Sequence, residues 1–149
     1  MSETRSPREV FHALLDGITA GRFAELDAFY AEDAVVERVF ETEPRWVEGR
    51  AALRERFLAL GEHTPLELAA RNVVVRATDD PEVVVGEWDY RVRHRDTGRE
   101  LTVANLQVMR VRDGLIVHSR DVHDHLALAH LLGTLPQLVA QREAALDAR

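Results

Sequence analysis

Three polar side chains recur at every second residue near the end of the last predicted strand: Ser119, Asp121 and His123. Alternate residues of a strand point to the same face. That face begins with Leu115 and Val117, so the polar group enters a pocket from the core side. A carboxylate can abstract a proton from carbon or oxygen, and a nearby imidazole can relay it near neutral pH. The spacing therefore predicts acid–base chemistry, with Asp121 as the base and His123 as its helper.

A structural interpretation of the same residues stays open. As a base, Asp121 needs a desolvated site and a partner that orients it. The alternative is a carboxylate paired with Arg38 or His123 that only completes the pocket wall, because structural ion pairs are also common in clefts. His123 is likewise compatible with a hydrogen-bonded wall residue.

The series Asp121-x-His123-x-His125 also contains the ligand types of a metal site. Asp124, however, is a good helix N-cap, and a helix that begins there turns His125 away from the strand face. The chain contains no Cys, which excludes thiolate ligands, thiol nucleophiles and disulfides. We therefore expect no metal site and no organic cofactor.

Further polar candidates lie on two other predicted strands. Arg38, in the segment 34–40, faces inward, where an unpaired guanidinium is very costly. It either holds an anionic oxygen of a ligand or reaches solvent at the pocket rim. Asn105 and Gln107 are amides in an otherwise apolar row, and a buried amide without partners costs about 1–3 kcal/mol. These two amides need a network, water or a ligand, and together with Arg38 they could stabilise an oxyanion.

The apolar wall of the pocket is predicted from strand parity. Between residues 87 and 95 the odd positions are charged, whereas the even positions include Trp88 and Tyr90. An apolar pocket with an aromatic wall suits a ring-shaped ligand. The remaining predicted lining residues come from the next strand and the first helix: Val103, Met109, Phe11 and Leu14.

The composition is that of an ordinary globular protein, with 149 residues, of which 46% are hydrophobic and 30% charged. The 19 Lys and Arg residues against 26 Asp and Glu give a net charge of −7. Nucleic-acid binding needs a cationic surface, so that class of partner is not expected. No apolar run approaches the roughly 20 residues that span a bilayer, and no secretory core is recognisable. We expect a cytoplasmic protein that does not contact membranes.

Helical periodicity dominates the first part of the chain. Ser6-Pro7-Arg8-Glu9 has the signature of a capped helix start, and helical stripes continue to about residue 60, apart from the predicted strand at 34–40. From about residue 66 the apolar period changes to two, and turn signals such as Asp113-Gly114 divide a meander of long strands. Helices followed by an antiparallel sheet indicate an α+β fold. We interpret residues 1–149 as one domain, with a core at about 6–133 and a helical C-terminal tail at 134–149.

The predicted strand at residues 101–111 is largely apolar on both faces. This pattern is typical of a central strand that is covered on two sides. The predicted helices cover one face, and a domain of this size has few helices left for the other. We therefore expect a homodimer through the outer face of the sheet.

Several segments together resemble the nuclear transport factor 2-like superfamily, in particular its SnoaL-like and ketosteroid isomerase-like branches. The resemblance runs from about residue 6 to residue 133 and depends on the order of three motifs: Tyr30-Ala31-Glu32-Asp33-Ala34, Glu48-Gly49-Arg50, and the stretch from Val108 to Asp124. It implies a cone-shaped α+β domain, in which N-terminal helices wrap a curved antiparallel sheet around a deep apolar pocket. It also implies dimerisation through the outer sheet face. Such a resemblance indicates a fold and does not by itself indicate a reaction.

The branches of this superfamily imply different reactions. A gapless match to ketosteroid isomerases puts Arg38 at the position of the base, Leu14 at that of the catalytic Tyr and Gln107 at that of the donor Asp. Steroid-type isomerisation is therefore not expected. The Asp-Arg-Asp set of limonene epoxide hydrolase keeps its last-strand Asp as Asp121, but its Arg-x-Asp pair is replaced by Trp88-Asp89-Tyr90. SnoaL-type polyketide cyclases, which the chain also resembles, use a single acid–base Asp on the last strand. Asp121 can fill that role.

We therefore expect a SnoaL-like small-molecule enzyme that transfers a proton on an apolar carbonyl or hydroxyl compound, as a cyclase, an isomerase or a dehydratase (a lyase). The expected catalytic residues are Asp121, His123 and Arg38. The expected substrate contacts are Trp88, Tyr90, Asn105, Gln107, Met109, Ser119 and Leu14. The alternative is a non-catalytic small-ligand-binding or accessory module of the same fold, which the missing isomerase groups favour. A third class, an adaptor for a partner protein, needs an exposed apolar patch outside the dimer face.

Overall fold

The computed structural model describes residues 4–41 and 45–148. Its first half contains α1 (Pro7–Thr19), the 3-10 helix η1 (Phe23–Phe29), β1 (Tyr30–Arg38), β2 (Trp46–Glu48) and α2 (Arg50–His63). Four long strands follow: β3 (Leu66–Ala77), β4 (Val83–His94), β5 (Glu100–Arg112) and β6 (Leu115–His123). The chain then forms α3 (His125–Leu132) and α4 (Leu135–Asp147). The α+β class expected from the sequence is confirmed.

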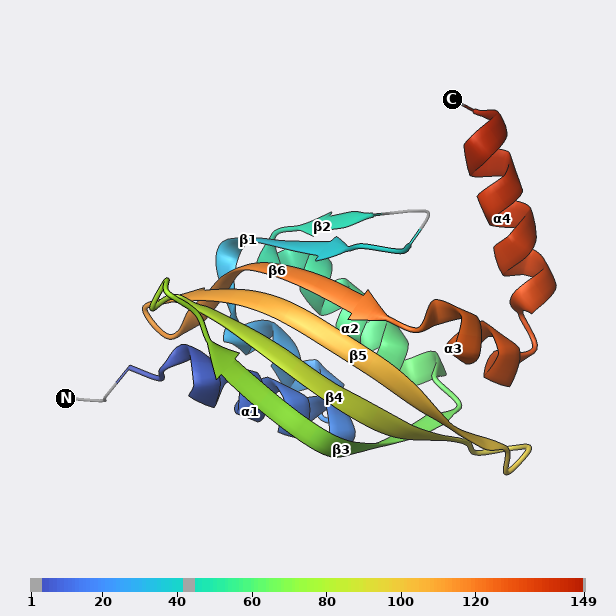
Figure 1. Ribbon diagram of the computed structural model, residues 1–149, viewed down its shortest axis with the longest axis horizontal. Helices are drawn as coiled ribbons and strands as arrows, with labels where there is room; N and C mark the ends of the chain where they lie inside the picture. The colour runs from blue at the N-terminus through green and yellow to red at the C-terminus, as the bar shows by residue number, and fades with distance from the viewer. Residues whose placement is uncertain (1–3, 42–44, 149) are drawn as a thin grey trace.

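The strands form one sheet in the order β2-β1-β6-β5-β4-β3 (Figure 1). Neighbouring strands are antiparallel, except that β1 runs parallel to β6. The sheet is therefore mixed, whereas the sequence analysis expected a wholly antiparallel one. The physical reason is the long crossover: α2 and the β3–β5 meander intervene before β6 returns beside β1. The sheet is not closed, because β2 and β3 are its two edges.

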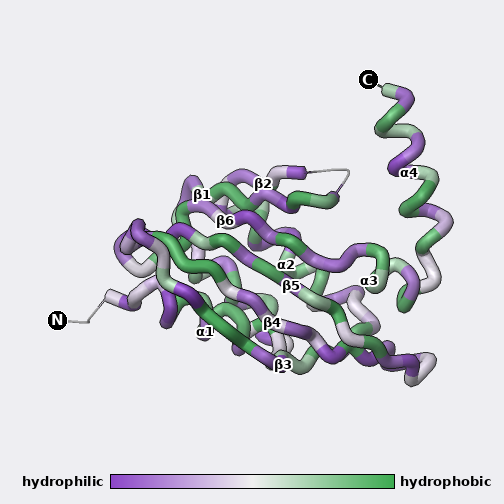
Figure 2. Tube along the Cα trace, viewed as in Figure 1, coloured by the Kyte–Doolittle hydropathy of each residue, from purple (hydrophilic) through white to green (hydrophobic). Residues whose placement is uncertain are grey.

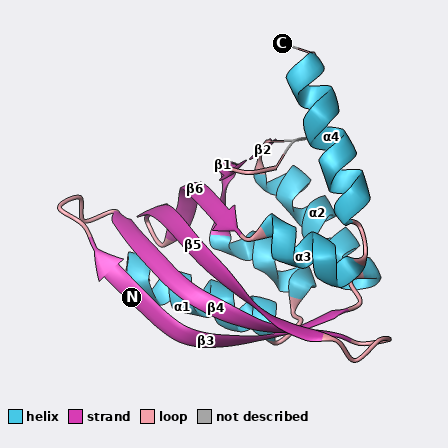
Figure 3. Ribbon diagram, turned by 45° about the vertical axis from the view of Figure 1, so that its right-hand side comes forward, coloured by secondary structure: helices cyan, strands magenta, loops and turns pink. Residues whose placement is uncertain are grey.

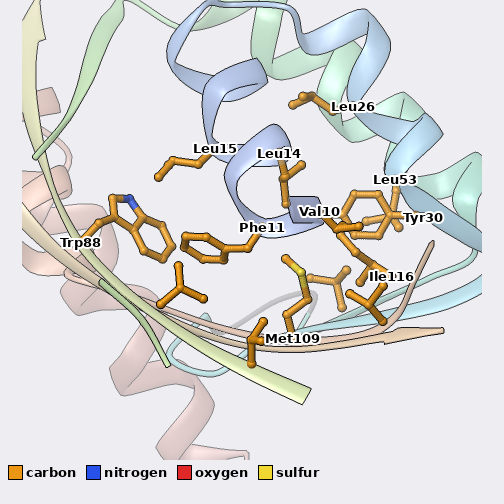
Figure 4. Packing of buried hydrophobic residues seen from close by; sticks show 14 of the residues in the cluster. Val10, Phe11, Leu14, Leu15, Leu26, Tyr30, Leu53, Trp88, Met109 and Ile116 are labelled. Atoms are coloured by element: carbon orange, nitrogen blue, oxygen red, sulfur yellow. The ribbon is translucent and has the colours of Figure 1, made fainter. Parts of the chain in front are cut away.

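The helices α1, α2 and α3 lie on one side of the sheet, which we call the inner face (Figure 3). Figure 4 shows Val10, Phe11 and Leu14 of α1 directed toward this face, and all three are at most 3% exposed. Gly86 of β4 makes the approach of α1 close. A Cβ atom at Gly86 would lie 2.0 Å from the ring of Phe11, so only glycine leaves room for this ring.

Local sequence signals are confirmed at three points. The Ser6 hydroxyl and the Glu9 carboxylate form the capping box of α1. Asp113 and Gly114 turn the β5–β6 hairpin with φ angles of 51° and 77°, as an Asp-Gly turn requires. The Asp124 carboxylate accepts a hydrogen bond from the N–H of Ala127 and caps α3.

The chain beyond α3 departs from the body of the domain. Hydrophobic residues recur along α4 (Figure 2), yet this helix buries none of its residues. Within residues 4–41 and 45–148, no helix is long and apolar enough to cross a membrane.

Candidate active site

A cavity of about 280 Å³ lies between the inner face of the sheet and the helices. Most of its wall is apolar, with contributions from α1, η1, α2 and the inner sides of β3 and β4. The polar side chains of the lining are Tyr30, Arg38, Glu41, Arg56, Thr64, Trp88, Tyr90, Asn105, Gln107, Asp121, His123 and His125. The pocket predicted from the sequence is therefore present, and most of its predicted polar residues lie on one wall.

Strand register brings these side chains together. Asp121 on β6 lies opposite Gln107 on β5 and opposite Arg38 on β1. Two residues along, His123 lies opposite Asn105, which in turn lies opposite Trp88 of β4. Cross-strand neighbours on one face stand about 5 Å apart. The two rows therefore form one continuous polar strip across the inner face.

Asp121 is held by two neutral donors through one oxygen. The Gln107 amide nitrogen donates to Asp121 Oδ1 at 2.8 Å and to Ser119 Oγ at 3.0 Å. The Ser119 hydroxyl donates to the same Oδ1. Because both bonds fall on Oδ1, the second carboxylate oxygen is left to take a proton from a bound molecule. Arg38 lies opposite Asp121 in the sheet, and the two opposite charges attract each other.

The hydrogen bonds of Asn105 determine the tautomer of His123. The amide nitrogen of Asn105 donates to the carbonyl oxygen of Val103 at 2.8 Å, so its Oδ1 atom is the one that faces His123 Nδ1, at 2.7 Å. Since an amide oxygen can only accept, Nδ1 carries the hydrogen and Nε2 keeps its lone pair. Burial lowers the pKa of His123, against a smaller opposite effect of Asp121. His123 is therefore a neutral imidazole with a free acceptor at neutral pH.

Arg38 is a buried wall residue. Its side chain is 7% exposed and pairs with Glu41 at 3.2 Å, so it does not extend into solvent at the rim. Burial lowers the pKa of the guanidinium, and the like charge of Arg56 lowers it further. The carboxylates of Glu41 and Asp121 act in the opposite direction. Arg38 thus stays a cation next to the polar strip.

Two tyrosine hydroxyls complete the polar groups of the site. Burial raises the pKa of Tyr90, which the sequence analysis named, and the negative charge of Asp121 raises it further. Tyr30 behaves in the same way, with burial as the main cause and Asp121 and Tyr90 as smaller ones. Tyr30 was not predicted as a site residue, because helical periodicity was expected to continue through its segment. In fact β1 begins at Tyr30 and ends at Arg38, and both side chains line the cavity.

His125 was also missed. We expected the start of α3 to turn it away, yet its side chain lines the cavity. Its ring centroid lies 6.0 Å from that of His123, and its Nδ1 atom lies 3.6 Å from Glu41 Oε1. Only the capping residue Asp124 separates His125 from the end of β6, and the His125 side chain stays on the cavity side of the sheet. His125 adds a second imidazole to the lining, and across the described ranges no group of three or more His, Cys, Asp or Glu side chains is arranged to hold a metal ion.

Two predicted substrate contacts lie beneath the wall of the cavity. Met109 and Ser119 are both 0% exposed and are absent from the lining. Met109 packs among the core residues under α1 (Figure 4), and Ser119 acts through its bond to Asp121. Leu14, in contrast, lines the cavity as predicted.

The open curved sheet, the helices on its inner face and the enclosed polar strip define a nuclear transport factor 2-like domain. The profile of the SnoaL-like domain matches residues 11–119, and the chain belongs to the SnoaL-like family. No curated protein sequence matches the chain significantly.

Solved structures support the same fold. A candidate isomerase from Bacillus subtilis superposes with a TM-score of 0.77 at 22% identity, over 85% of this chain and 91% of that one. A candidate polyketide cyclase from Xanthomonas campestris pv. campestris superposes with a TM-score of 0.67 at 21% identity, over 82% and 93% of the two chains. SalBIII, an epoxide hydrolase/cyclase-like enzyme of pyran ring formation in the polyether salinomycin, superposes with a TM-score of 0.63 at 17% identity, over 78% and 89%.

Proposed function

We propose that this protein is a cofactor-independent enzyme that removes a proton next to the carbonyl group of a small apolar compound. The observation that carries the proposal is Asp121, a carboxylate that lines a largely apolar cavity and whose Oδ1 atom is fixed by Gln107 and Ser119. A base that is fixed in this way needs no reorganisation at the moment of transfer. The names of the similar isomerase and polyketide cyclases are compatible with this chemistry.

Asp121 takes the proton from the carbon atom, and the electron pair of the broken C–H bond moves onto the carbonyl oxygen as an enolate. The donors for that oxygen are the hydroxyls of Tyr30 and Tyr90, which stay protonated because their pKa values are raised, and the Arg38 cation. Gln107 has a different role from the one predicted. Both of its N–H bonds are already used, on Ser119 and Asp121, so it positions the base and does not contact the oxyanion.

Three outcomes share this first step. Return of the proton from Asp121 to another carbon gives isomerisation. Attack of the enolate on a second carbonyl within the molecule, with the proton passed to the new alkoxide, gives cyclisation. Departure of a β-hydroxyl group, which takes up the proton and leaves as water, gives dehydration. The neutral His123, with its free Nε2 atom, can accept and return the proton in each case.

Proton exchange tests the shared step without knowledge of the natural substrate. The ketone 2-tetralone is incubated with the protein in D₂O, and loss of the α-hydrogen signals is followed by NMR. We expect the wild type to accelerate exchange, and Asp121→Asn to reduce the protein-dependent rate by about 10²–10⁴-fold. Asp96→Asn, in the exposed β4–β5 turn, is the matched control and should exchange like the wild type.

The same experiment separates an enzyme from a binding module. If the wild type binds 2-tetralone without accelerating its exchange, or if Asp121→Asn exchanges as fast as the wild type, the proposal is wrong. The non-catalytic ligand-binding interpretation would then take its place.

A further inference from the structure

The cavity opens to solvent beside α2. Two residues of this helix, Arg56 and Leu60, line the cavity and are also exposed, whereas every other described lining residue is buried or half-buried. A side chain that lines a cavity and also meets solvent lies at its opening. Arg56 and Leu60 are four positions apart, so they are neighbours on one face of the helix. A molecule that enters the cavity at this opening therefore passes Arg56.

Arg56 is a charged residue on an otherwise apolar face of α2. The other residues of this helix that line the cavity are Leu53, Phe57 and Leu60. The aliphatic stem of an arginine can lie along such a surface while its guanidinium stays at the solvent boundary. The sequence of α2 thus places one positive charge at the edge of an apolar wall.

The three arginines of α2 differ in their partners. Arg50 and Arg54 pair with Asp27, at 3.6 and 3.0 Å. Arg56 forms no ion pair within residues 4–41 and 45–148. The carboxylate of Glu41, which also lines the cavity, is already paired with the Arg38 guanidinium at 3.2 Å. The cation of Arg56 is therefore available to a bound molecule.

Arg38 and Arg56 bring two like charges near each other in this lining. After burial, the charge of Arg56 is the main cause that lowers the pKa of Arg38. Burial is also the main cause that lowers the pKa of His123, and Arg56 contributes in the same direction. An anion bound at Arg56 would offset this repulsion, because an opposite charge favours the charged form of a cation.

We propose that the bound molecule carries a carboxylate group that pairs with the Arg56 guanidinium at the mouth of the cavity, while its apolar ring occupies the interior. The planar fork of a guanidinium matches the two oxygens of a carboxylate. Arg56 belongs to the helical wall and Asp121 to the sheet, so the acid group and the reacting carbonyl bind to different walls. This inference rests on the proposed function, because it concerns the same cavity, and it narrows the substrate class to ring ketones with an acidic substituent. Arg56 is a specificity-determining residue in this arrangement.

A ketone acid and its neutral ester isolate this contact. 2-Tetralone-6-carboxylate and its methyl ester have the same rings and the same reacting carbonyl, and they differ in charge at neutral pH. We expect the wild type to bind the carboxylate about tenfold more tightly by calorimetry, since a charge-assisted pair is stronger than a neutral contact. Added salt should reduce this preference.

Substitutions of Arg56 test the assignment. In Arg56→Gln the preference should fall to one or below, because the remaining protein is strongly acidic, with a net charge of −7 before the substitution. Arg56→Lys keeps the charge without the planar fork and should retain part of the preference, and it serves if the Gln variant fails to fold. Arg8→Gln is the matched control. It removes the same charge from an exposed site on α1 outside the lining and should keep the full preference.

The outcomes make failure of this inference distinct from failure of the proposed function. Equal affinity of the wild type for acid and ester, a preference that survives in Arg56→Gln, or no binding of either ketone would overturn the inference. Exchange of the α-hydrogens of 2-tetralone together with equal affinity would overturn the inference alone. A preference that depends on Arg56, without any acceleration of exchange, would support the inference and overturn only the proposed function.

Discussion

His123 and His125 are neutral imidazoles in a largely apolar wall, and their burial makes the stability of the fold depend on pH. Burial is the main cause that lowers the pKa of each. Around His123, the carboxylates of Asp121 and Glu41 favour the charged form, whereas His125 and Arg56 oppose it. In the unfolded chain these imidazoles are exposed to water and not buried, so they take up protons at a higher pH than in the folded protein.

This difference predicts that acid destabilises the fold in a window set by histidine. The contribution of neutral His123 is fully present above the ordinary histidine pKa of 6.5 and is lost as the pH falls toward the lower folded value. The melting temperature of the wild type should therefore fall between pH 7.5 and 5.5. In His123→Gln, which cannot be protonated, this fall should be smaller. His63→Gln, at an exposed site, should follow the wild type, and an unchanged slope in His123→Gln would contradict the prediction.

At the scale of elements, the contact between α1 and β4 sets the depth of the cavity. Phe11 reaches the sheet only because Gly86 has no side chain. Its ring then lies 5.4 Å from that of Trp88, and both rings line the cavity. Displacement of α1 would therefore move the apolar side of the site relative to Asp121.

Substitution of Gly86 should test this contact. Gly86→Ala forces a clash with the Phe11 ring, and overpacking of this kind typically costs about 1–3 kcal/mol of the free energy of unfolding. In a Phe11→Leu background, where the ring is absent, the same substitution should cost clearly less. Chemical denaturation of the two single variants and the double variant measures the coupling. Additive effects would mean that the contact does not limit the approach of α1.

At the scale of the whole molecule, no described helix covers the outer face of the sheet (Figure 1). Its centre carries half-buried apolar residues: Val85, Leu106, Val108 and Val122. Ion pairs such as Arg91–Glu100 and Arg93–Glu67 surround this centre on the β3–β5 side. An apolar centre with a charged rim is the usual anatomy of a protein interface.

We propose that two copies of the chain associate through this face. Sedimentation equilibrium should then give twice the monomer mass for the wild type. Leu106→Arg places an unpaired charge in the centre of the interface and should weaken association at least tenfold. Leu58→Arg, at a 41% exposed site on α2, introduces the same change on the helical side and should leave the mass unchanged. A monomeric wild type would show that the outer face does not join two copies.

Sequence reasoning succeeded where a signal is local or periodic. The cap at Ser6, the turn at Asp113 and the inward parity of Trp88 and Tyr90 each depend on a few neighbouring residues, and all are present in the structure. Strand parity also predicted the inner-face row of Asn105, Gln107, Asp121 and His123, since alternation along a strand determines the face without knowledge of the partners.

The sequence by itself determined the class of the fold, the faces of its strands and which polar side chains share the inner face, because period and capping act over short distances along the chain. Only the tertiary structure decided which groups meet. The parallel pairing of β1 with β6 placed Arg38 opposite Asp121, and the packing of α3 returned His125 to the cavity. The first contact joins strands that are far apart in the chain, and the second depends on how the chain turns from β6 into α3. Their partners are set by register and helix packing, which the order of residue types does not encode locally.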